Sequence, residues 1–360
     1  MAALSPRQSH SSGWLFCKAG CALLVLATLL LGGCQRQPLP VELSGSTMGT
    51  TWHVTYLPAE QAAEPAAMQA ELEELEELLV AVNDSMSTWQ ADSEISRFNR
   101  APVGEWVAVS APFAEVVAAA LAIGELSGGA YDVTVGPLVE LWGFGPSRPR
   151  LDVPSAAAIR ERQAQVGQQF LELDRAQNRM RRLRAVELDL SSIAKGYAVD
   201  VLAEALMAQQ IADFLVEVGG EMRLSGRSPR GDAWRIAVER PQPGARSVAL
   251  GIALSDAAVA TSGDYRNYFE VDGRRYSHSI DPRSGWPVQH DLVSVTVIAA
   301  DCMRADAWAT ALTVLGAEAA LALAEAQGLA VYLLRRDGES IVPSYSSAFE
   351  PWLEASNQTR

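Results

Sequence analysis

The sequence contains little histidine and little cysteine, with four residues of each among 360. They form no cluster with the spacing of zinc ligands, so a zinc site is not expected. The chain also lacks the G-x-S-x-G turn of serine hydrolases and the glycine spacing of a Walker phosphate-binding loop. Any active site must therefore be of another kind than a zinc site, a serine-hydrolase turn or a Walker loop.

Positive charge is scarce as well. The chain has 29 lysines and arginines against 43 aspartates and glutamates, a formal net charge of −14, which argues against a nucleic-acid-binding surface. An anionic ligand would need local lysine or arginine, a metal ion or a helix N-terminus to hold it. With 49% hydrophobic and 20% charged residues, the composition is that of a globular protein with one large domain or two closely packed ones.

The first 34 residues have the pattern of a secretory signal. An uncharged apolar stretch runs from Cys21 to Cys34 and is too short to span a membrane comfortably. Its end, "LGGC", resembles a bacterial lipobox, which implies that Cys34 becomes the lipidated first residue of the mature chain. An uncleaved anchor helix is the alternative. In either case we expect the rest of the chain outside the cytoplasm, anchored by its N-terminus on the periplasmic side of the cell inner membrane.

These features divide the chain into a lipoprotein signal peptide at 1–33, a tether at 34–44 and a single domain at 45–355. Because the signal and the lipidated position account for three of the four cysteines, only Cys302 remains in the domain. An exported domain with one thiol has no intramolecular disulfide, so it must be held together by its core.

Helix-like and strand-like patterns are intermixed along the domain. Helical spacing predicts helices at 66–82, 112–127, 154–166, 192–209, 304–316 and 317–328. Alternating or β-branched runs predict strands at 48–57, 186–190, 213–226, 234–240, 247–255, 292–300 and, as the last one, 329–336. Residues 130–145 are predicted to be a strand or turn that leads into a glycine- and tryptophan-rich loop. Because several strands follow one another directly, we expect an α+β fold with mixed or antiparallel sheets and packed helices.

The stretch "DLSSIAKGYAVD" (189–200) is the first candidate for chemistry. A strand is predicted to end at Leu190 and a helix to begin at Ser192, with Lys195 in its first turn. The free N–H groups of a helix start, together with a lysine, suit a phosphate. Serine capping beside an exposed lysine is the alternative.

The stretch "ADAWAT" (305–310) is the second candidate. Asp306 and Thr310 are four residues apart, so both project from one helix face. A carboxylate and a hydroxyl, with backbone carbonyls, form an oxygen set suited to Mg²⁺. A threonine that bonds to its own helix backbone is the alternative.

The stretch "SHSIDPRSGWPV" (277–288) is the third. It places His278 in a loop made rigid by prolines and glycine. The histidine can be a buried residue with a bonded ring, a metal ligand or a general base. Asp281 can either orient this histidine or cap the Asp-Pro turn.

Taken together, eight motifs in this order resemble the ApbE family of flavin transferases. They lie at 48–50, 86–99, 130–145, 189–200, 216–226, 261–269, 278–288 and 305–310, and they cover nearly the whole domain. The resemblance implies an α+β, T-fold-related architecture. It also implies an enzyme that uses Mg²⁺ and transfers the FMN half of FAD to a threonine or serine hydroxyl of a target protein, releasing AMP. In this family the targets are subunits of membrane redox complexes, such as the sodium-pumping NADH:quinone reductase and Rnf-type complexes.

The resemblance also assigns residues. The flavin pocket is expected to include Met48, Trp89, Ala130, Tyr131, Asp132, Asp189, Lys195 and Ile280. The metal is expected to bind Asp306 and Thr310 and the carbonyls of Ser192 and Ala309. Within this chemistry His278 is the candidate base, because it has a near-neutral pKa and lies on a rigid loop. Two other functions would use the same residues: an FAD pyrophosphatase that releases FMN and AMP, and a non-enzymatic FAD-binding lipoprotein.

Overall fold

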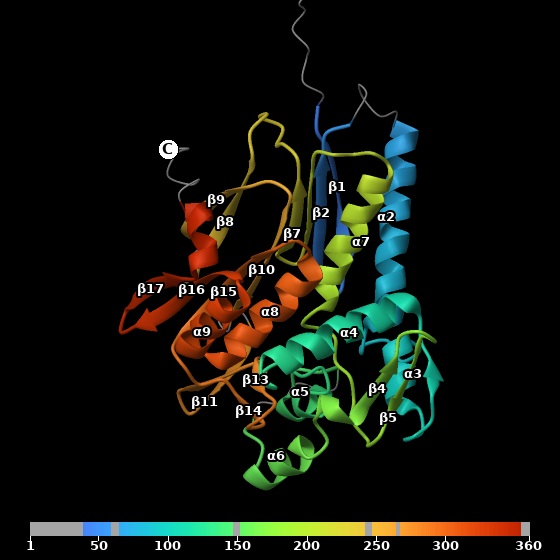
Figure 1. Ribbon diagram of the computed structural model, residues 1–360, viewed down its shortest axis with the longest axis vertical. Coiled ribbons are helices and arrows are strands. Elements are labelled where there is room, and N and C mark those ends of the chain that lie inside the picture. Colours follow the sequence, from blue (N-terminus) through green and yellow to red (C-terminus); the bar gives the residue numbers. More distant parts are fainter. Residues whose placement is uncertain (1–38, 59–64, 147–151, 242–246, 264–266, 354–360) are drawn as a thin grey trace, which may run out of the picture. The chain divides into compact units, whose positions relative to one another are not determined.

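An eight-stranded antiparallel sheet organises the part of the chain that the computed structural model describes, residues 39–58, 65–146, 152–241, 247–263 and 267–353 (Figure 1). Its strands, in spatial order, are β1 (Val41–Thr47), β2 (Thr50–Tyr56), β6 (Phe214–Val218), β7 (Glu221–Ser225), β10 (Ala257–Gly263), β15 (Leu292–Ala299), β16 (Ala330–Asp337) and β17 (Ser340–Tyr345). Every neighbouring pair is antiparallel. The expected α+β class with antiparallel sheets is confirmed.

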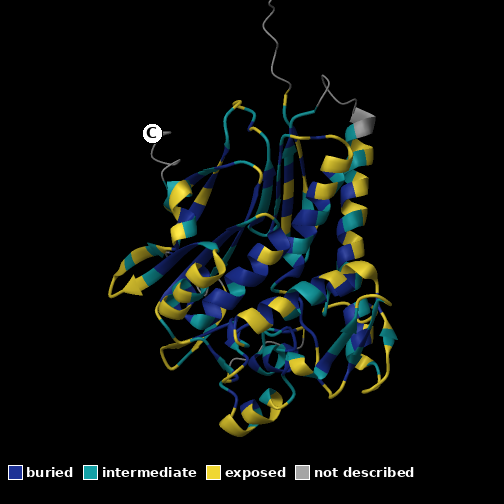
Figure 2. Ribbon diagram, in the orientation of Figure 1, coloured by how far each residue is buried: buried dark blue, intermediate teal, exposed yellow. Residues whose placement is uncertain are grey.

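Helices cover one face of this sheet. They are α2 (Pro65–Met86), α7 (Ala194–Ala208), α8 (Cys302–Leu315) and α9 (Ala317–Gln327), and α4 (Ala111–Leu126) packs against α8 (Figure 1). Alternate strand residues such as Trp52, Val54 and Val216 are fully buried beneath them. Such strand residues recur at every second position, and they belong to one apolar cluster with buried helix residues such as Leu202 and Leu312. This is the largest apolar cluster of the described chain (Figure 2).

The opposite face of the sheet packs against a hairpin of β8 (Trp234–Arg240) and β9 (Ser247–Leu254), with the short helix η2 (Ser347–Phe349) beside it. A third apolar cluster joins α5 (Gly136–Trp142) and α6 (Ala156–Gln163) to the hairpins β11 (Tyr268–Val271)–β12 (Arg274–Ser277) and β13 (Ile280–Asp281)–β14 (Trp286–Pro287). A small sheet of β3 (Val107–Ala108), β5 (Arg179–Arg182) and β4 (Leu171–Asp174), the helix α3 (Glu94–Arg100) and the short η1 (Gln168–Phe170) complete the elements.

The helices α7 and α8 are joined by a buried carboxylate. Asp200 of α7 accepts hydrogen bonds from the backbone N–H groups of Cys302 and Met303 at 3.0 and 2.8 Å, and Arg223 of β7 donates to it at 2.8 Å. These two N–H groups belong to the first turn of α8 and have no partner within that helix. Asp200, which lies on α7, therefore caps the N-terminus of α8. Cys302 is a buried free thiol.

Several predicted boundaries are wrong for identifiable reasons. The residues assigned to the tether include 41–44, which belong to β1: Val41 and Leu43 are buried while Glu42 and Ser44 are exposed, so the ordered fold begins before residue 45. The prolines around them had suggested a linker. The loop predicted within 130–145 contains α5, and 186–190 is extended but forms only a single bridge, from Glu187 to Val135.

Other strands were missed or merged. The run 213–226 holds two strands, because Gly219 and Gly220 have positive φ values of 61° and 106° and turn the chain back on itself. The strand expected to be the last is followed by β17. Strands β11 to β14 and the small sheet were not predicted, because strands of two to four residues are too short to show a period. β10 was also missed: its first four residues are all buried, so its seven residues show no alternation.

Cys34 and the signal segment lie outside the described residues. Within those residues, none of the helices has the length and apolar character needed to cross a membrane.

Candidate active site

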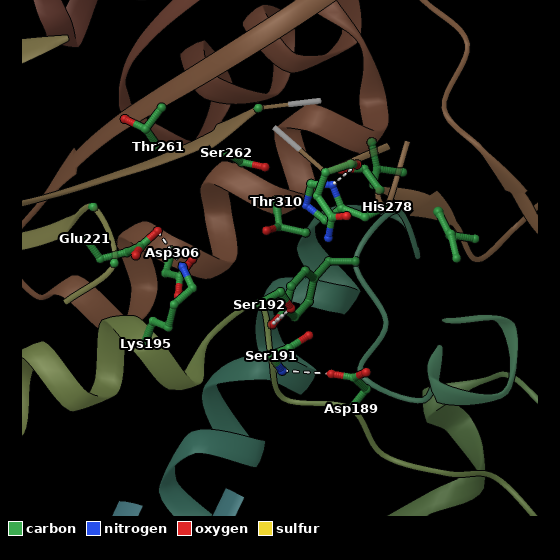
Figure 3. A pocket seen from close by; sticks show the side chains of 18 of the residues that line it. Asp189, Ser191, Ser192, Lys195, Glu221, Thr261, Ser262, His278, Asp306 and Thr310 are labelled. Atoms are coloured by element: carbon green, nitrogen blue, oxygen red, sulfur yellow. Dashed lines mark hydrogen bonds and ion pairs between the residues drawn. The ribbon is translucent and has the colours of Figure 1, made fainter. Parts of the chain in front are cut away.

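A cavity of about 520 Å³ opens where the helix layer, the sheet and the β11–β14 region meet (Figure 3). Its volume lies in the range of small-molecule sites. Ten of the residues expected from the sequence line it: Ala130, Tyr131, Asp132, Asp189, Ser192, Lys195, His278, Ile280, Asp306 and Thr310. The fold therefore brings together motifs that are up to 180 positions apart in the chain.

The remaining expected residues lie elsewhere. Met48 is in the β1–β2 turn, with a φ of 50°, and borders a separate shallow hollow. Trp89 is 69% exposed and outside the cavity. Ala309 is fully buried in α8, and its carbonyl accepts a hydrogen bond from the Thr313 hydroxyl at 2.8 Å.

Asp306 and Thr310 lie on one face of α8, as their spacing predicted. Oδ2 of Asp306 accepts a hydrogen bond from the backbone N–H of Gly196 at 3.1 Å. Among the described residues, neither Oδ1 of Asp306 nor the Thr310 hydroxyl has a hydrogen-bond partner, and it is Thr313, one turn later, that bonds to the helix backbone. Two oxygen ligands thus remain available at the cavity wall, a donor set that fits Mg²⁺ completed by water or substrate oxygens.

Lys195 forms an ion pair with Glu221, with 2.7 Å between Nζ and Oε1. Burial by itself lowers the pKa of Lys195, but the carboxylates of Asp306 and Glu221 outweigh it and hold that pKa above its ordinary value. Burial raises the pKa of Glu221 to about 7, against the effect of Lys195. The second oxygen of Glu221, Oε2, is buried without a hydrogen-bond partner in the described residues. A paired lysine and an incompletely bonded carboxylate therefore stand beside Asp306.

The start of α7 differs from the prediction. Ser192 does not cap the helix; Ile193 is the N-cap residue, and the Ser192 hydroxyl donates to the Tyr131 hydroxyl at 3.1 Å. The N–H groups of Ile193 and Ala194 donate to the Leu190 carbonyl, and that of Gly196 donates to Asp306. Most of the helix start is thus satisfied within the protein, so it offers an anion little beyond the charge of Lys195.

His278 projects into the cavity from the loop between β12 and β13. Its Nδ1 lies 3.0 Å from the backbone carbonyl oxygen of Asn267. Because a carbonyl only accepts, Nδ1 carries the proton and the neutral ring presents Nε2 as an acceptor. Burial lowers the pKa of His278, partly offset by that hydrogen bond and reinforced by the charge of Lys195. Phe144 contacts the ring edge-on, with 6.3 Å between centroids.

The loop after His278 is held by its own turn. Oδ1 of Asp281 accepts from the backbone N–H and the Nε of Arg283, both at 2.9 Å, and the Asp281 carbonyl accepts from Gly285 at 2.8 Å. Trp142 Nε1 donates to the Gly285 carbonyl at 2.9 Å. Of the two roles considered for Asp281, the structure therefore favours capping, and the partner that orients His278 is the Asn267 carbonyl.

Asp132 and Asp189 shape the opposite wall. Asp132 accepts from the backbone N–H of Thr134 at 2.8 Å and of Gln168 at 2.9 Å. Asp189 accepts from the backbone N–H of Ser191 at 2.8 Å (Figure 3). Both carboxylates fix turns that carry cavity residues.

Glu221 and Asn267 were not predicted as site residues. They lie in two of the eight motifs, "VEVGGEMRLSG" (216–226) and "TSGDYRNYF" (261–269), but nothing in their spacing distinguishes them from surface residues. The feature of the sequence that could have indicated Glu221 is its place directly after Gly219 and Gly220.

The comparisons with known proteins show the family. The model of the ApbE family matches residues 48–333. The chain belongs to the ApbE family. A FAD:protein FMN transferase of Haemophilus influenzae is 44% identical over 337 residues, covering 92% of this chain and 97% of the relative. A FAD:protein FMN transferase of Vibrio cholerae is 45% identical over 333 residues, covering 92% and 98%.

Solved ApbE structures share the fold. The flavin transferase ApbE from Vibrio cholerae superposes with a TM-score of 0.81 and 43% identity, covering 88% of this chain and 99% of that one. The apo form of the flavinyl transferase ApbE from Pseudomonas stutzeri also has a TM-score of 0.81, with 40% identity and 89% and 99% coverage. The α+β fold that the resemblance to this family implied is therefore confirmed by these solved ApbE structures.

Proposed function

We propose that this chain is a Mg²⁺-dependent FAD:protein FMN transferase that attaches FMN to a threonine or serine of a target protein and releases AMP. One observation carries the proposal: the cavity joins His278 to Asp306 and Thr310 in a chain that is 44–45% identical, over nearly its whole length, to enzymes of that name.

His278 acts as the base in this proposal. Its neutral ring presents Nε2 to the cavity, so it can accept the proton of the acceptor hydroxyl. The hydroxyl oxygen forms a bond to the phosphorus on the FMN side of the pyrophosphate. The bond from that phosphorus to the oxygen of the AMP phosphate breaks, and AMP leaves with both electrons of the bond. The proton remains on Nε2 until solvent removes it.

The charges of the pyrophosphate need partners on the opposite wall. Lys195 contributes a full positive charge, since the carboxylates around it keep it protonated. Asp306 and Thr310, each with an available oxygen, would hold Mg²⁺, with the Ser192 carbonyl as a further ligand at the wall. When bound, the metal supplies charge neutralisation for the phosphates. The partly exposed Lys195 and the free oxygens are consistent with a site completed by the substrate itself.

The apolar side of the cavity suits a flavin ring. Ile280 and Tyr131 are 5% and 3% exposed and line the cavity with Ala130. Burial raises the pKa of the Tyr131 hydroxyl, which keeps it neutral and hydrogen-bonded to Ser192. An aromatic substrate placed here would bury its faces against neutral groups.

The acceptor and the location are further parts of the proposal. Subunits of membrane redox complexes, the sodium-pumping NADH:quinone reductase and Rnf-type complexes, are the expected targets. A lipid on Cys34 would hold the domain at the periplasmic face of the inner membrane, close to such complexes.

Product analysis tests the proposal. The full chain in detergent is incubated with FAD, Mg²⁺ and a peptide spanning the acceptor threonine of a sodium-pumping NADH:quinone reductase subunit. We expect the peptide to gain the mass of one FMN less one water. Free FMN and AMP with an unmodified peptide would instead identify an FAD pyrophosphatase. FAD that stays bound and intact would identify a flavin-binding protein.

A further inference from the structure

One strand of the main sheet extends beyond its neighbour at the cavity. β10 pairs with β15 through six residues, from Ala258 to Gly263. On its other side it pairs with β7 only through residues 257–259. Among the residues that the structure describes, 260–263 therefore have a sheet partner on one side only.

The β6–β7 turn is the reason that the pairing stops. β7 begins at Glu221, and the chain reverses at Gly219 and Gly220, both with positive φ. A Cβ on Gly220 would meet no atom within 4 Å. Continued by one step, the printed register places Glu221 opposite Ala260, and the chain then turns away at Gly220 and Gly219. β7 therefore offers no strand residue opposite residues 261–263.

This free edge is part of the cavity wall. Thr261, Ser262 and Gly263 all line the cavity, and Figure 3 shows the first two on the strand at its border. Among the described residues, no hydrogen bond is recorded for the backbone groups of these three residues apart from their ladder with β15. In an antiparallel strand, alternate residues direct their N–H and C=O groups to the two sides. About half of these groups therefore face the cavity unpaired, a costly arrangement unless a ligand or water completes it.

The candidate base lines the same cavity as this edge. Asn267, four residues after Gly263, provides the carbonyl that bonds to both the backbone N–H and the Nδ1 of His278, at 3.1 and 3.0 Å. A polypeptide that followed the edge of β10 would pass beside the loop that carries Nε2 of His278. A peptide backbone matches the regular donor and acceptor spacing of a strand edge.

We propose that the acceptor protein binds as an extended segment that adds a strand to the free edge of β10 at residues 260–263, and so presents its threonine or serine hydroxyl to His278. This inference rests on the proposed transferase function and specifies how its protein substrate is held. Backbone pairing gives affinity with little demand on the acceptor's side chains, while the reacting residue must be a hydroxyl that points into the cavity.

A backbone methylation scan of the acceptor peptide tests the pairing. Each non-acceptor residue within four positions of the threonine is N-methylated in turn, which removes one backbone donor and leaves the side chain in place. The full chain in detergent is assayed with FAD and Mg²⁺ for transfer to each peptide. We expect KM to rise about tenfold at alternate positions, where the N–H faces β10, and to change less than twofold at the positions between them. The value of kcat should stay within twofold for all peptides that retain the acceptor hydroxyl.

The outcomes separate the two claims. Transfer with no alternation in KM would overturn the strand-addition proposal and leave the transferase function intact. The proposal would also be overturned if alanine replacement of side chains on one face of the peptide raised KM while N-methylation did not. No transfer to the unmethylated peptide would overturn both.

Discussion

The backbone N–H of Gly196 donates a hydrogen bond to Oδ2 of Asp306, 3.1 Å away, and so ties the start of α7 to the middle of α8. The contact leaves no room for a side chain: a Cβ at position 196 would lie 2.8 Å from Cβ of Asp306 and closer still to the Cys302 carbonyl oxygen. The two helices approach this closely only because the residue is glycine.

We predict that Gly196→Ala destabilises the domain by about 2–3 kcal/mol, because overpacking against backbone outweighs the gain of about 1 kcal/mol in helix propensity. Chemical unfolding of the full chain measures this difference. Gly251→Ala is the matched control, since Gly251 lies in β9 and a Cβ there meets nothing within 4 Å. Its free energy of unfolding should change by less than about 0.5 kcal/mol. Equal effects of the two substitutions would show that the helix contact is not tight.

Asp306→Asn should remove Mg²⁺ binding while keeping the fold. The asparagine retains an oxygen that can accept from Gly196, but it lacks the negative charge that holds a hard cation. Thermal unfolding measures this without turnover: adding Mg²⁺ to the chain with FAD should raise the Tm of the wild-type chain above its value with FAD alone, and should cause no further rise in the variant. Transfer should fall at least about 100-fold. A variant that retains the Mg²⁺-dependent shift would exclude Asp306 as a ligand.

The pH dependence of transfer should report on His278. Burial holds the pKa of this histidine below its ordinary value of 6.5, so the base is already neutral at pH 7. We expect kcat/KM to rise with pH along an acidic limb whose midpoint lies below 6.5, and to level off above it. His278→Ala should abolish that limb and lower the plateau by about 100-fold or more, with FAD affinity retained. His53→Ala, on the exposed surface of β2, should keep the wild-type profile, and an unchanged limb in His278→Ala would assign the base elsewhere.

The Lys195–Glu221 pair gives a prediction for stability. Without the lysine, the pKa of Glu221 should rise further above its present value of about 7. The folded state then retains a proton that the unfolded state has released, so stability falls as pH rises from about 4.5 towards the folded pKa. Lys195→Met should therefore destabilise the domain more at pH 8.5 than at pH 5.5, by up to about 3 kcal/mol at the higher pH.

Adding Glu221→Gln to Lys195→Met should restore most of that stability, because the buried charge is removed with its partner. Urea unfolding at the two pH values measures both variants. A loss that is independent of pH, or that the second substitution does not restore, would mean that the lysine acts through packing of its carbon chain.

Much of the fold followed from local pattern. The helices at α2, α4, α7, α8 and α9 and the strand β15 have long, regular apolar periods, and these were predicted within a few residues. The failures are short or interrupted elements. β13 and β14 have two residues each, and no period can be read from them. β1 follows two prolines and was taken for a tether, although the buried Val41 and Leu43 alternate with exposed residues.

The site was predictable where residues of one motif act together. Asp306 and Thr310 share a helix face, and four-residue spacing is enough to reveal that. The partner of Lys195 was not predictable, because Glu221 approaches it from a strand 26 positions later. The hydrogen bond between Asn267 and His278 likewise depends on how the chain folds between β10 and β12. For the start of α7, the sequence offered serine capping or a phosphate seat, and the structure shows its N–H groups taken by Leu190 and Asp306 instead.

The balance of products in a single reaction tests the central claim most directly. AMP, free FMN and acceptor-bound flavin are quantified together over time, with and without the acceptor peptide, in the presence of FAD and Mg²⁺. A transferase should release one AMP for each FMN bound to the peptide and should release AMP only slowly without it. AMP release at the same rate in both reactions, with all of the FMN free in solution, would contradict the account.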